Sequence, residues 1–145
     1  MAQRSNQITS KQKATCFMNC IIIGSRAVGK TSILDQYVNK KFNNEMCSTM
    51  GTDFMSKQFI SESGEKCDVK IWDTAGSERF NSMAKSFYRQ AEGVIIVFNL
   101  TDLASYKAVK NNWLTAIRNA SGTHDEPIPA VLVGNKLDLA ELGER

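Results

Sequence analysis

The sequence predicts an α/β fold, a doubly wound and mostly parallel sheet with helices on both faces. Apolar runs with strand character alternate with stretches in which apolar residues recur at helical spacing. Residues 94–100 are apolar almost throughout, as expected for a central parallel strand covered on both faces. A glycine-containing loop follows the first strand, and this order places a ligand at the carboxyl ends of the strands.

The elements can be placed one by one. Strands are expected at residues 17–23, 54–61, 67–73 and 94–100, with a last one after Pro127 and Pro129. Helices are expected at residues 31–40, around 80–91 and around 106–117. Ser63-Gly64 is typical of a hairpin turn between the second and third strands. Residues 1–14 are polar and predict a flexible tail, and residues 15–145 predict one domain.

The loop after the first strand carries the most specific motif. Residues 24–31 have the spacing G-x-x-x-x-G-K-[ST] of a phosphate-binding loop, and strand, loop and helix come in the required order. Successive backbone N–H groups then cradle phosphates, and the helix adds its positive N-terminal end. Lys30 is expected to reach the β/γ-phosphates and the Thr31 hydroxyl a magnesium ion. The predicted nucleotide contacts of this segment are Gly24, Ser25, Arg26, Ala27, Val28, Gly29, Lys30, Thr31 and Ser32.

A second motif predicts which base is bound. Asn135, Lys136 and Asp138 follow an apolar run in the pattern N-K-x-D. A carboxylate at Asp138 can accept hydrogen bonds from N1–H and the exocyclic amino group of guanine, whereas adenine offers no such pair of donors. An unpaired buried polar group costs about 1–3 kcal/mol, so such a site rejects adenine. A plain surface turn is the alternative. Phe42 either stacks edge-on against the guanine or belongs to the core.

A third motif, 72–76, ends a strand with alternating apolar residues. Asp73 is placed to hold magnesium, usually through water, and Gly76 offers a backbone N–H to a γ-phosphate. Thr49, in the preceding loop, is a candidate second hydroxyl ligand. The predicted metal ligands are therefore Thr31, Thr49 and Asp73.

These motifs, in this order, resemble the Ras superfamily of small GTPases, and within it the Rab family. The narrower resemblance rests on residues 51–54, 70–76, 86–91, 94–102 and 109–117, within a similarity that covers about residues 16–139. It implies a phosphate-loop G-domain that binds GTP/GDP with Mg²⁺ and acts as a switch in membrane traffic. Effectors, exchange factors and activating proteins are expected at two switch segments, Thr49–Phe54 and Trp72–Tyr88. Trp72 is expected there as an exposed contact, and Phe87 as a core residue.

Two departures from the family pattern concern catalysis. Ser77 stands where the family usually has the glutamine that orients the attacking water, and its side chain is too short for that role. By the same resemblance, Arg26 would project toward the place where an activating protein inserts an arginine finger, which is worth roughly 10³–10⁵ in rate. With Ser77, Thr49 and Gly76 as the catalytic candidates, we expect slow hydrolysis and a weak response to activators. The alternative is that Arg26 serves as a finger in cis.

Composition agrees with one cytoplasmic domain. The 145 residues are 42% hydrophobic with a net charge of +3, which is too small a charge to predict nucleic-acid binding. Four cysteines lack C-x-x-C spacing and predict free thiols rather than disulfides or zinc: Cys16, Cys20, Cys47 and Cys67. The sequence shows neither a signal stretch nor an apolar run of membrane-spanning length.

The end of the sequence leaves the function open. The resemblance implies a further strand, a final helix and a prenylated tail after Arg145, so we expect a C-terminally shortened G-domain without an encoded membrane anchor. An unpaired edge near Val131 is then expected, covered by a partner chain unless the chain is a fragment or short isoform. A GTP-hydrolysing switch and a nucleotide-held interaction subunit with little turnover both remain. An ATP-using kinase is disfavoured by Asp138 and by the Asp73-Thr74-Ala75-Gly76 motif.

Overall fold

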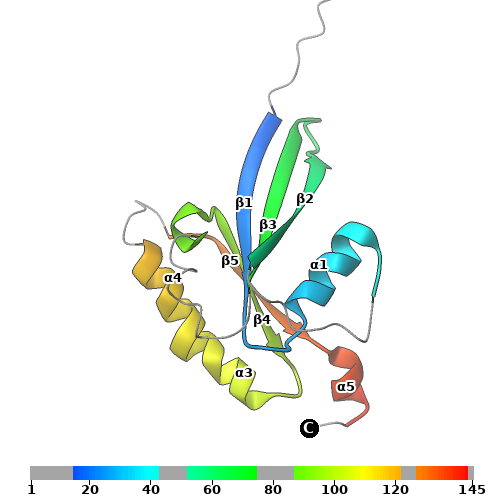
Figure 1. The fold of residues 1–145 in the computed structure, drawn as a ribbon, viewed down its shortest axis with the longest axis vertical. Helices are drawn as coiled ribbons and strands as arrows, with labels where there is room; N and C mark the ends of the chain where they lie inside the picture. The colour runs from blue at the N-terminus through cyan, green and yellow to red at the C-terminus, as the bar shows by residue number, and fades with distance from the viewer. Residues whose placement is uncertain (1–14, 43–51, 75–86, 122–126, 144–145) are drawn as a thin grey trace, which may run out of the picture.

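The computed structural model describes residues 15–42, 52–74, 87–121 and 127–143 (Figure 1). The strands are β1 (Thr15–Ile23), β2 (Thr52–Ile60), β3 (Lys66–Thr74), β4 (Gly93–Asn99) and β5 (Ala130–Asn135). The helices are α1 (Lys30–Asn39), α3 (Leu103–Ala108), the π-helical η2 (Val109–Trp113), α4 (Leu114–Ser121) and α5 (Leu137–Glu141). The predicted tail, residues 1–14, lies outside the described residues.

The described strands form a five-stranded sheet in the order β2-β3-β1-β4-β5. β1 pairs in parallel with β3 and β4, and β4 pairs in parallel with β5. β2 pairs with β3 in antiparallel fashion across the predicted hairpin, in which Gly64 has a positive φ of 77°. The predicted doubly wound, mostly parallel sheet is therefore confirmed.

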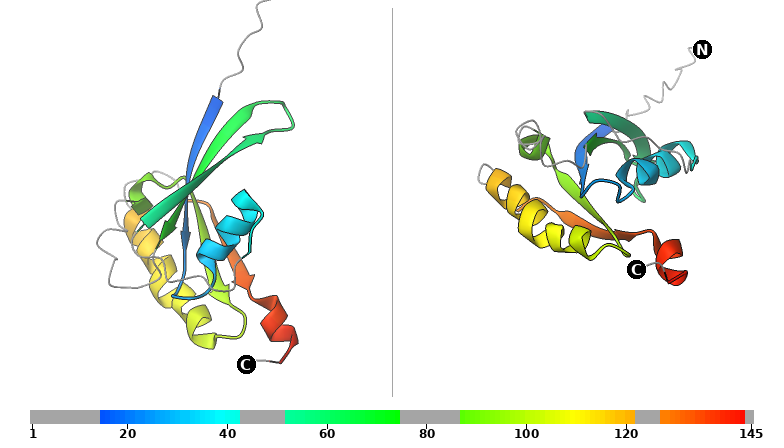
Figure 2. Two further views of the ribbon diagram at one scale, coloured as in Figure 1. Left: turned by 45° about the vertical axis from the view of Figure 1, so that its right-hand side comes forward. Right: turned by 60° about the horizontal axis from the view of Figure 1, so that its bottom comes forward.

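Strand alternation divides the core into two halves. Ile22 belongs to the cluster under α1, with Val28, Leu34, Ile71 and Val97. Ile21 and Ile23 point to the other face. They join a cluster with Tyr88, Ala91, Val94, Ile96, Val109, Trp113 and Ile117. Figures 1 and 2 show α1 on one side of the sheet and α3 and α4 on the other. Helices on both faces, as predicted, explain why β4 and the carboxyl end of β1, Ile21 to Ile23, are apolar and buried.

Two local features differ from the expectations. The helix predicted around residues 106–117 spans α3, η2 and α4, and within it the Leu114 N–H donates to the Val109 carbonyl in a π-type turn. A uniform helical period does not predict the extra residue of such a turn. The short helix α5 was not predicted because its five residues hold no periodic pattern; Lys136, with φ of 64°, turns the chain into it.

β5 lies at the edge of the sheet formed by the described strands. Val131 is 62% exposed and Leu132 50% exposed, in line with the edge expected near Val131.

Of the predicted helix at 80–91, only residues 87–90 are described as helical. Within the described ranges, every helix is too short or too polar to cross a bilayer.

Ile22→Ala is expected to lower the free energy of unfolding by about 2–5 kcal/mol, because Ile22 is fully buried beneath α1. Ile60→Ala is the matched control, since Ile60 is 69% exposed and should cost well under 1 kcal/mol. Urea unfolding of both variants measures the difference. Equal losses for the two would contradict this description of the core.

Candidate functional site

The loop between β1 and α1 is built around two glycines that tolerate no side chain. Gly24 has φ of 146°, and a Cβ there would lie 2.1 Å from the Val97 carbonyl oxygen. Gly29 has φ of 98°, and a Cβ there would lie 2.3 Å from Asn135 Nδ2. Ala27, between them, also has a positive φ, of 60°. The two fixed glycines of the motif are therefore required by close contacts with β4 and with the end of β5.

Lys30 begins α1, and its side chain folds back into the loop. Its Nζ donates to the Gly24 carbonyl at 3.0 Å and to the Ser25 carbonyl at 3.1 Å, and only 6% of the residue is exposed. Burial lowers the pKa of Lys30 to about 8, and the negative charge of Asp73 partly opposes this shift. The structure thus places a cation inside the loop.

Thr31 and Asp73 bring two oxygen groups together beside the loop. The Thr31 hydroxyl donates to Asp73 Oδ2 at 2.5 Å. Asp73 is 2% exposed and lies in register with Ile22, while the Thr74 hydroxyl donates to the Ile22 carbonyl at 2.8 Å. A hydroxyl and a carboxylate are oxygen ligands of the kind Mg²⁺ prefers, so these two side chains fit a magnesium site next to the loop.

Asn135 joins the second motif to the loop. Its Nδ2 donates to the Val28 carbonyl at 2.8 Å, although the two residues are 107 positions apart in the sequence. The Asn135 carbonyl accepts from the Leu100 N–H at 3.0 Å, which holds the end of β5 against the chain that leaves β4. The segment predicted to bind the base and the segment predicted to bind phosphates therefore form one structural unit.

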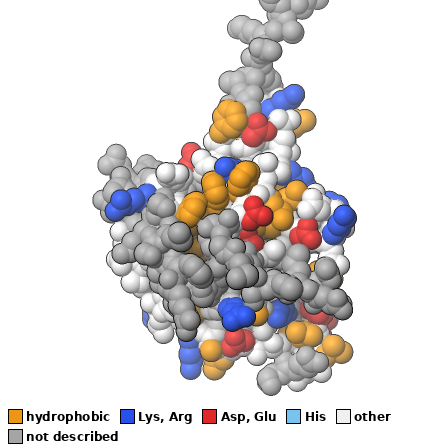
Figure 3. Space-filling model, in the orientation of Figure 1, with side chains coloured by type: hydrophobic (Ala, Val, Ile, Leu, Met, Phe, Trp, Pro, Cys, Tyr) orange, Lys and Arg blue, Asp and Glu red, His pale blue; other side chains and the backbone are white. Residues whose placement is uncertain are grey.

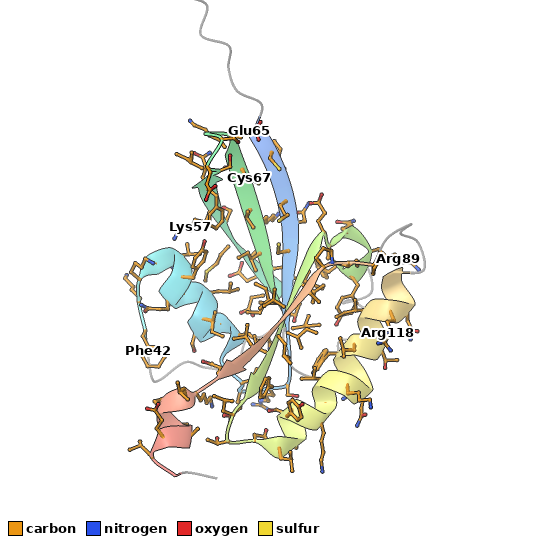
Figure 4. All side chains as sticks on the ribbon, turned by 180° about the vertical axis from the view of Figure 1, so that it is seen from behind. Phe42, Lys57, Glu65, Cys67, Arg89 and Arg118 are labelled. Atoms are coloured by element: carbon orange, nitrogen blue, oxygen red, sulfur yellow. The ribbon has the colours of Figure 1, made fainter. Side chains whose placement is uncertain are left out.

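The remaining described candidates lie around this unit. Asp138 is exposed in the first turn of α5, and Lys136 is partly buried before it. Phe42 is 69% exposed, so the core alternative for this residue is wrong. Figure 4 shows Phe42 on the segment that leaves α1. In the loop itself, Arg26 is exposed, whereas Ser25 and Ser32 are partly buried.

A family model described as "Ras family" matches residues 19–144. The chain belongs to the Ras family. Relatives include the Ras-related protein RABG3f of Arabidopsis thaliana, 40% identical over 129 residues that make up 88% of this chain and 62% of the relative. The Ras-related protein Rab7 of Pisum sativum is 40% identical over 123 residues, which are 84% of this chain and 59% of the relative.

A fungal relative, the Ypt/Rab-type GTPase avaA of Emericella nidulans, is 37% identical over 134 residues, or 92% of this chain and 64% of the relative. The chain thus spans about 60% of the length of the curated relatives it matches. These matches confirm the resemblance to the Rab family that the motifs predicted.

Three predicted site residues of this Ras-family chain, Thr49, Gly76 and Ser77, lie outside the described residues.

The described parts of the two switch segments contact each other through an aromatic group that consists of Phe54, Trp72 and Phe87. Trp72 lies 5.1 Å from Phe54 and 4.9 Å from Phe87, measured between ring centroids. Lys70 Nζ lies 3.7 Å from the centroid of Phe54 and 4.1 Å from that of Trp72.

The exposure of this group differs from the expectation. Trp72 is half-buried between its two aromatic neighbours, and Phe54, which is 47% exposed, presents more of its surface. Tyr88 lies in the core, and burial raises its pKa to about 12. The sequence did not lead us to predict that Lys70 belongs to this group, although strand alternation places it on the same face as Trp72. Figure 3 shows hydrophobic side chains gathered on the face toward the viewer, beside the grey residues.

Gly29→Ala is expected to lower the free energy of unfolding by about 2–3 kcal/mol, because it adds a clash with Asn135 to the cost of a positive φ. The same change in an Asn135→Ala background should cost only about 1 kcal/mol. Gly143→Ala is the control for φ alone, since Gly143 has φ of 77° and open space around its Cβ position. A double-mutant cycle by urea unfolding measures the coupling. Additive losses would contradict the close approach of Gly29 and Asn135.

Proposed function

We propose that the chain is a Rab-like small GTPase, a GTP/GDP switch in vesicle and membrane traffic. The observation that carries this proposal is the hydrogen bond from Asn135 to Val28, which joins the base segment to the phosphate loop. The relatives, Ras-related proteins and a Ypt/Rab-type GTPase, support the same class. Acting as such a switch, the chain would work in the cytoplasm and at the cytosolic face of membranes.

The phosphates would be held by backbone N–H groups of residues 24–32 and by the charge of Lys30. Lys30 Nζ donates to the carbonyls of Gly24 and Ser25, which occupy donors that a phosphate would take. Phosphate oxygens are stronger acceptors for an ammonium group than neutral carbonyls are. Nucleotide binding would therefore draw the Lys30 side chain from its own loop onto the β/γ-phosphates.

Mg²⁺ would be held by Thr31 and Asp73, with Thr49 as a further ligand, and would neutralise charge on the β- and γ-phosphate oxygens. Ligand binding would separate the Thr31 hydroxyl from Asp73 Oδ2, since each would then face the cation. Gly76 would offer its N–H to the γ-phosphate. The two switch segments, Thr49–Phe54 and Trp72–Tyr88, would be ordered by that phosphate.

The guanine base would be selected by Asp138, with Asn135 and Lys136 holding the segment in place and Phe42 stacking on the ring. Asp138 is exposed, and guanine would cover it and supply two donors. Adenine would cover the same carboxylate without pairing it, which is the basis of the proposed discrimination.

Intrinsic turnover is proposed to be slow because Ser77 replaces the usual glutamine. The response to activating proteins is proposed to be weak because the exposed Arg26 would block the arginine finger. The same two residues favour a second candidate, a nucleotide-held interaction subunit that hardly hydrolyses GTP. Proposed partners are effectors, exchange factors and activating proteins at the aromatic group. A partner chain over the exposed edge near Val131 also remains a proposal.

Asp138→Ala is expected to abolish purine selectivity. The unchanged chain should prefer GDP to ADP by at least about 100-fold, and inosine diphosphate, which lacks the exocyclic amino group, should bind more weakly than GDP. In the variant the three affinities should converge. Glu141→Ala, a change to an exposed carboxylate on the same helix, is the control. Calorimetric titration measures all affinities, and an unchanged GDP preference in Asp138→Ala would contradict the assignment.

Affinity for GDP is expected to fall as the pH rises above about 8, the value to which burial lowers the pKa of Lys30. Below this pH Lys30 is charged in both states, whereas above it binding must first restore its proton. The affinity should then fall by up to about tenfold per pH unit. Lys30→Arg, which keeps its charge, should remove this dependence between about pH 7 and 9. Parallel slopes for both proteins would contradict the role of Lys30.

Hydrolysis of bound GTP is expected to be slower than in a full-length Rab7 relative measured alongside. Ser77→Gln should raise the single-turnover rate by about tenfold or more, because glutamine can orient the water. Arg26→Ala should leave that rate unchanged, and Arg118→Ala serves as the surface-arginine control. A slower Arg26→Ala variant would instead support the finger in cis. A rate equal to that of the relative would contradict slow turnover.

A further inference from the structure

Two cysteines from different strands face each other at the end of the sheet remote from the candidate site. Cys16 of β1 lies directly in register with Cys67 of β3. In-register neighbours on adjacent strands point to the same face of a sheet. The strand spacing of about 4.7–4.9 Å falls within the Cα separation of about 4.4–6.8 Å found in disulfides. The backbone therefore meets the first requirement for a bond between them.

The environment of the Cys67 thiol agrees with this placement. A hydrogen bond with Cys16 is the main cause that raises the pKa of the Cys67 thiol, ahead of partial burial and of the nearby charges. The two thiols thus lie near each other, and Cys16 Sγ also donates to the Phe17 carbonyl at 3.9 Å. Cys16 is exposed, Cys67 is half-buried, and both are free thiols. Figure 4 shows Cys67 near Glu65, at the hairpin end of β3.

The pair is separate from the site described above. Cys16 precedes Gly24 by eight residues of extended chain, a distance of roughly 25 Å along the strand. Cys20 lies on the same face of β1 but is in register with Ile71 and Gly93, so no thiol on β3 faces it. Cys20 is therefore a natural control for a thiol on the same strand.

We propose that Cys16 and Cys67 form a reversible intrachain disulfide, which makes this end of the sheet a redox-modification site for hydrogen peroxide. The Cys16 thiolate attacks a peroxide oxygen; the S–O bond forms, the O–O bond breaks, and the leaving hydroxide takes up a proton to give water. Cys67 then attacks the Cys16 sulfur; the S–S bond forms, the S–O bond breaks, and hydroxide with the Cys67 proton leaves as a second water. Two thiols are oxidised and one peroxide is reduced to two waters.

The bond would close residues 16–67 into a loop that contains the phosphate loop, α1 and β2. A crosslink over a loop of this length restricts the unfolded chain and so stabilises the folded one. The expected effect is a higher thermal midpoint, by roughly 5–15 °C for a chain of this size. This inference goes beyond the proposed function and does not depend on nucleotide binding.

The test uses the whole chain carrying Cys20→Ser and Cys47→Ser, so that Cys16 and Cys67 are its only thiols. Hydrogen peroxide is added, and the remaining thiols are counted over time. Trypsin should then release residues 14–26 linked to residues 67–70, with the mass of the sum less two hydrogen atoms. A reducing agent should separate the two peptides and return the thermal midpoint to its starting value.

The control moves one thiol along the same strand face. Cys16→Ser with Met18→Cys, in the same background, keeps two thiols but pairs the new one in register with Val69 instead of Cys67. The unshifted pair should form the intrachain bond at least about tenfold faster than this control. Equal rates, a link between chains only, or oxidation of Cys16 to sulfinic acid without a linked peptide would each overturn the proposal.

Discussion

The hydrogen bond from the Asn135 side chain to the Val28 carbonyl is the contact on which the candidate site depends. It joins the end of β5 to the loop after β1, two segments that meet only because parallel strands deliver their carboxyl ends to one edge of the sheet. The approach requires a residue without a side chain at Gly29, since a Cβ there would lie 2.3 Å from Asn135 Nδ2. The glycine at position 29 and the amide of Asn135 therefore depend on each other, although they lie far apart in the sequence.

A second consequence concerns the charges next to this contact. Lys30 and Asp73 are nearly buried, and each is held by local groups: Lys30 by two loop carbonyls and Asp73 by the Thr31 hydroxyl. Burying a cation lowers the pKa of Lys30, which is a measure of how much solvation it has lost. An anionic ligand with a divalent cation would restore partners of opposite charge to both groups. This arrangement of buried charges thus fits a site for a magnesium-bound polyphosphate.

Much of the fold could be predicted from the sequence because the signals are local. Alternating apolar residues mark β3, and the continuous apolar run marks β4 as covered on both faces. The glycines at 24 and 29 were predicted as parts of a phosphate loop, and both have positive φ. What could not be predicted depends on tertiary contact. The register that places Cys16 beside Cys67 joins residues far apart in the sequence, so no local pattern predicts it. The same holds for the hydrogen bond from Asn135 to Val28. The π-type turn at Val109 was missed because a helical period describes regular helices only.

Identifying the nucleotide that co-purifies with the protein tests the central claim most directly. The chain would be purified in the presence of Mg²⁺, unfolded, and its released small molecules separated by chromatography and weighed. The account predicts GDP or GTP in an amount approaching one per chain, released by a chelator and taken up again with Mg²⁺. Adenine nucleotides in that fraction, or an emptied chain that takes up no GDP, would contradict it.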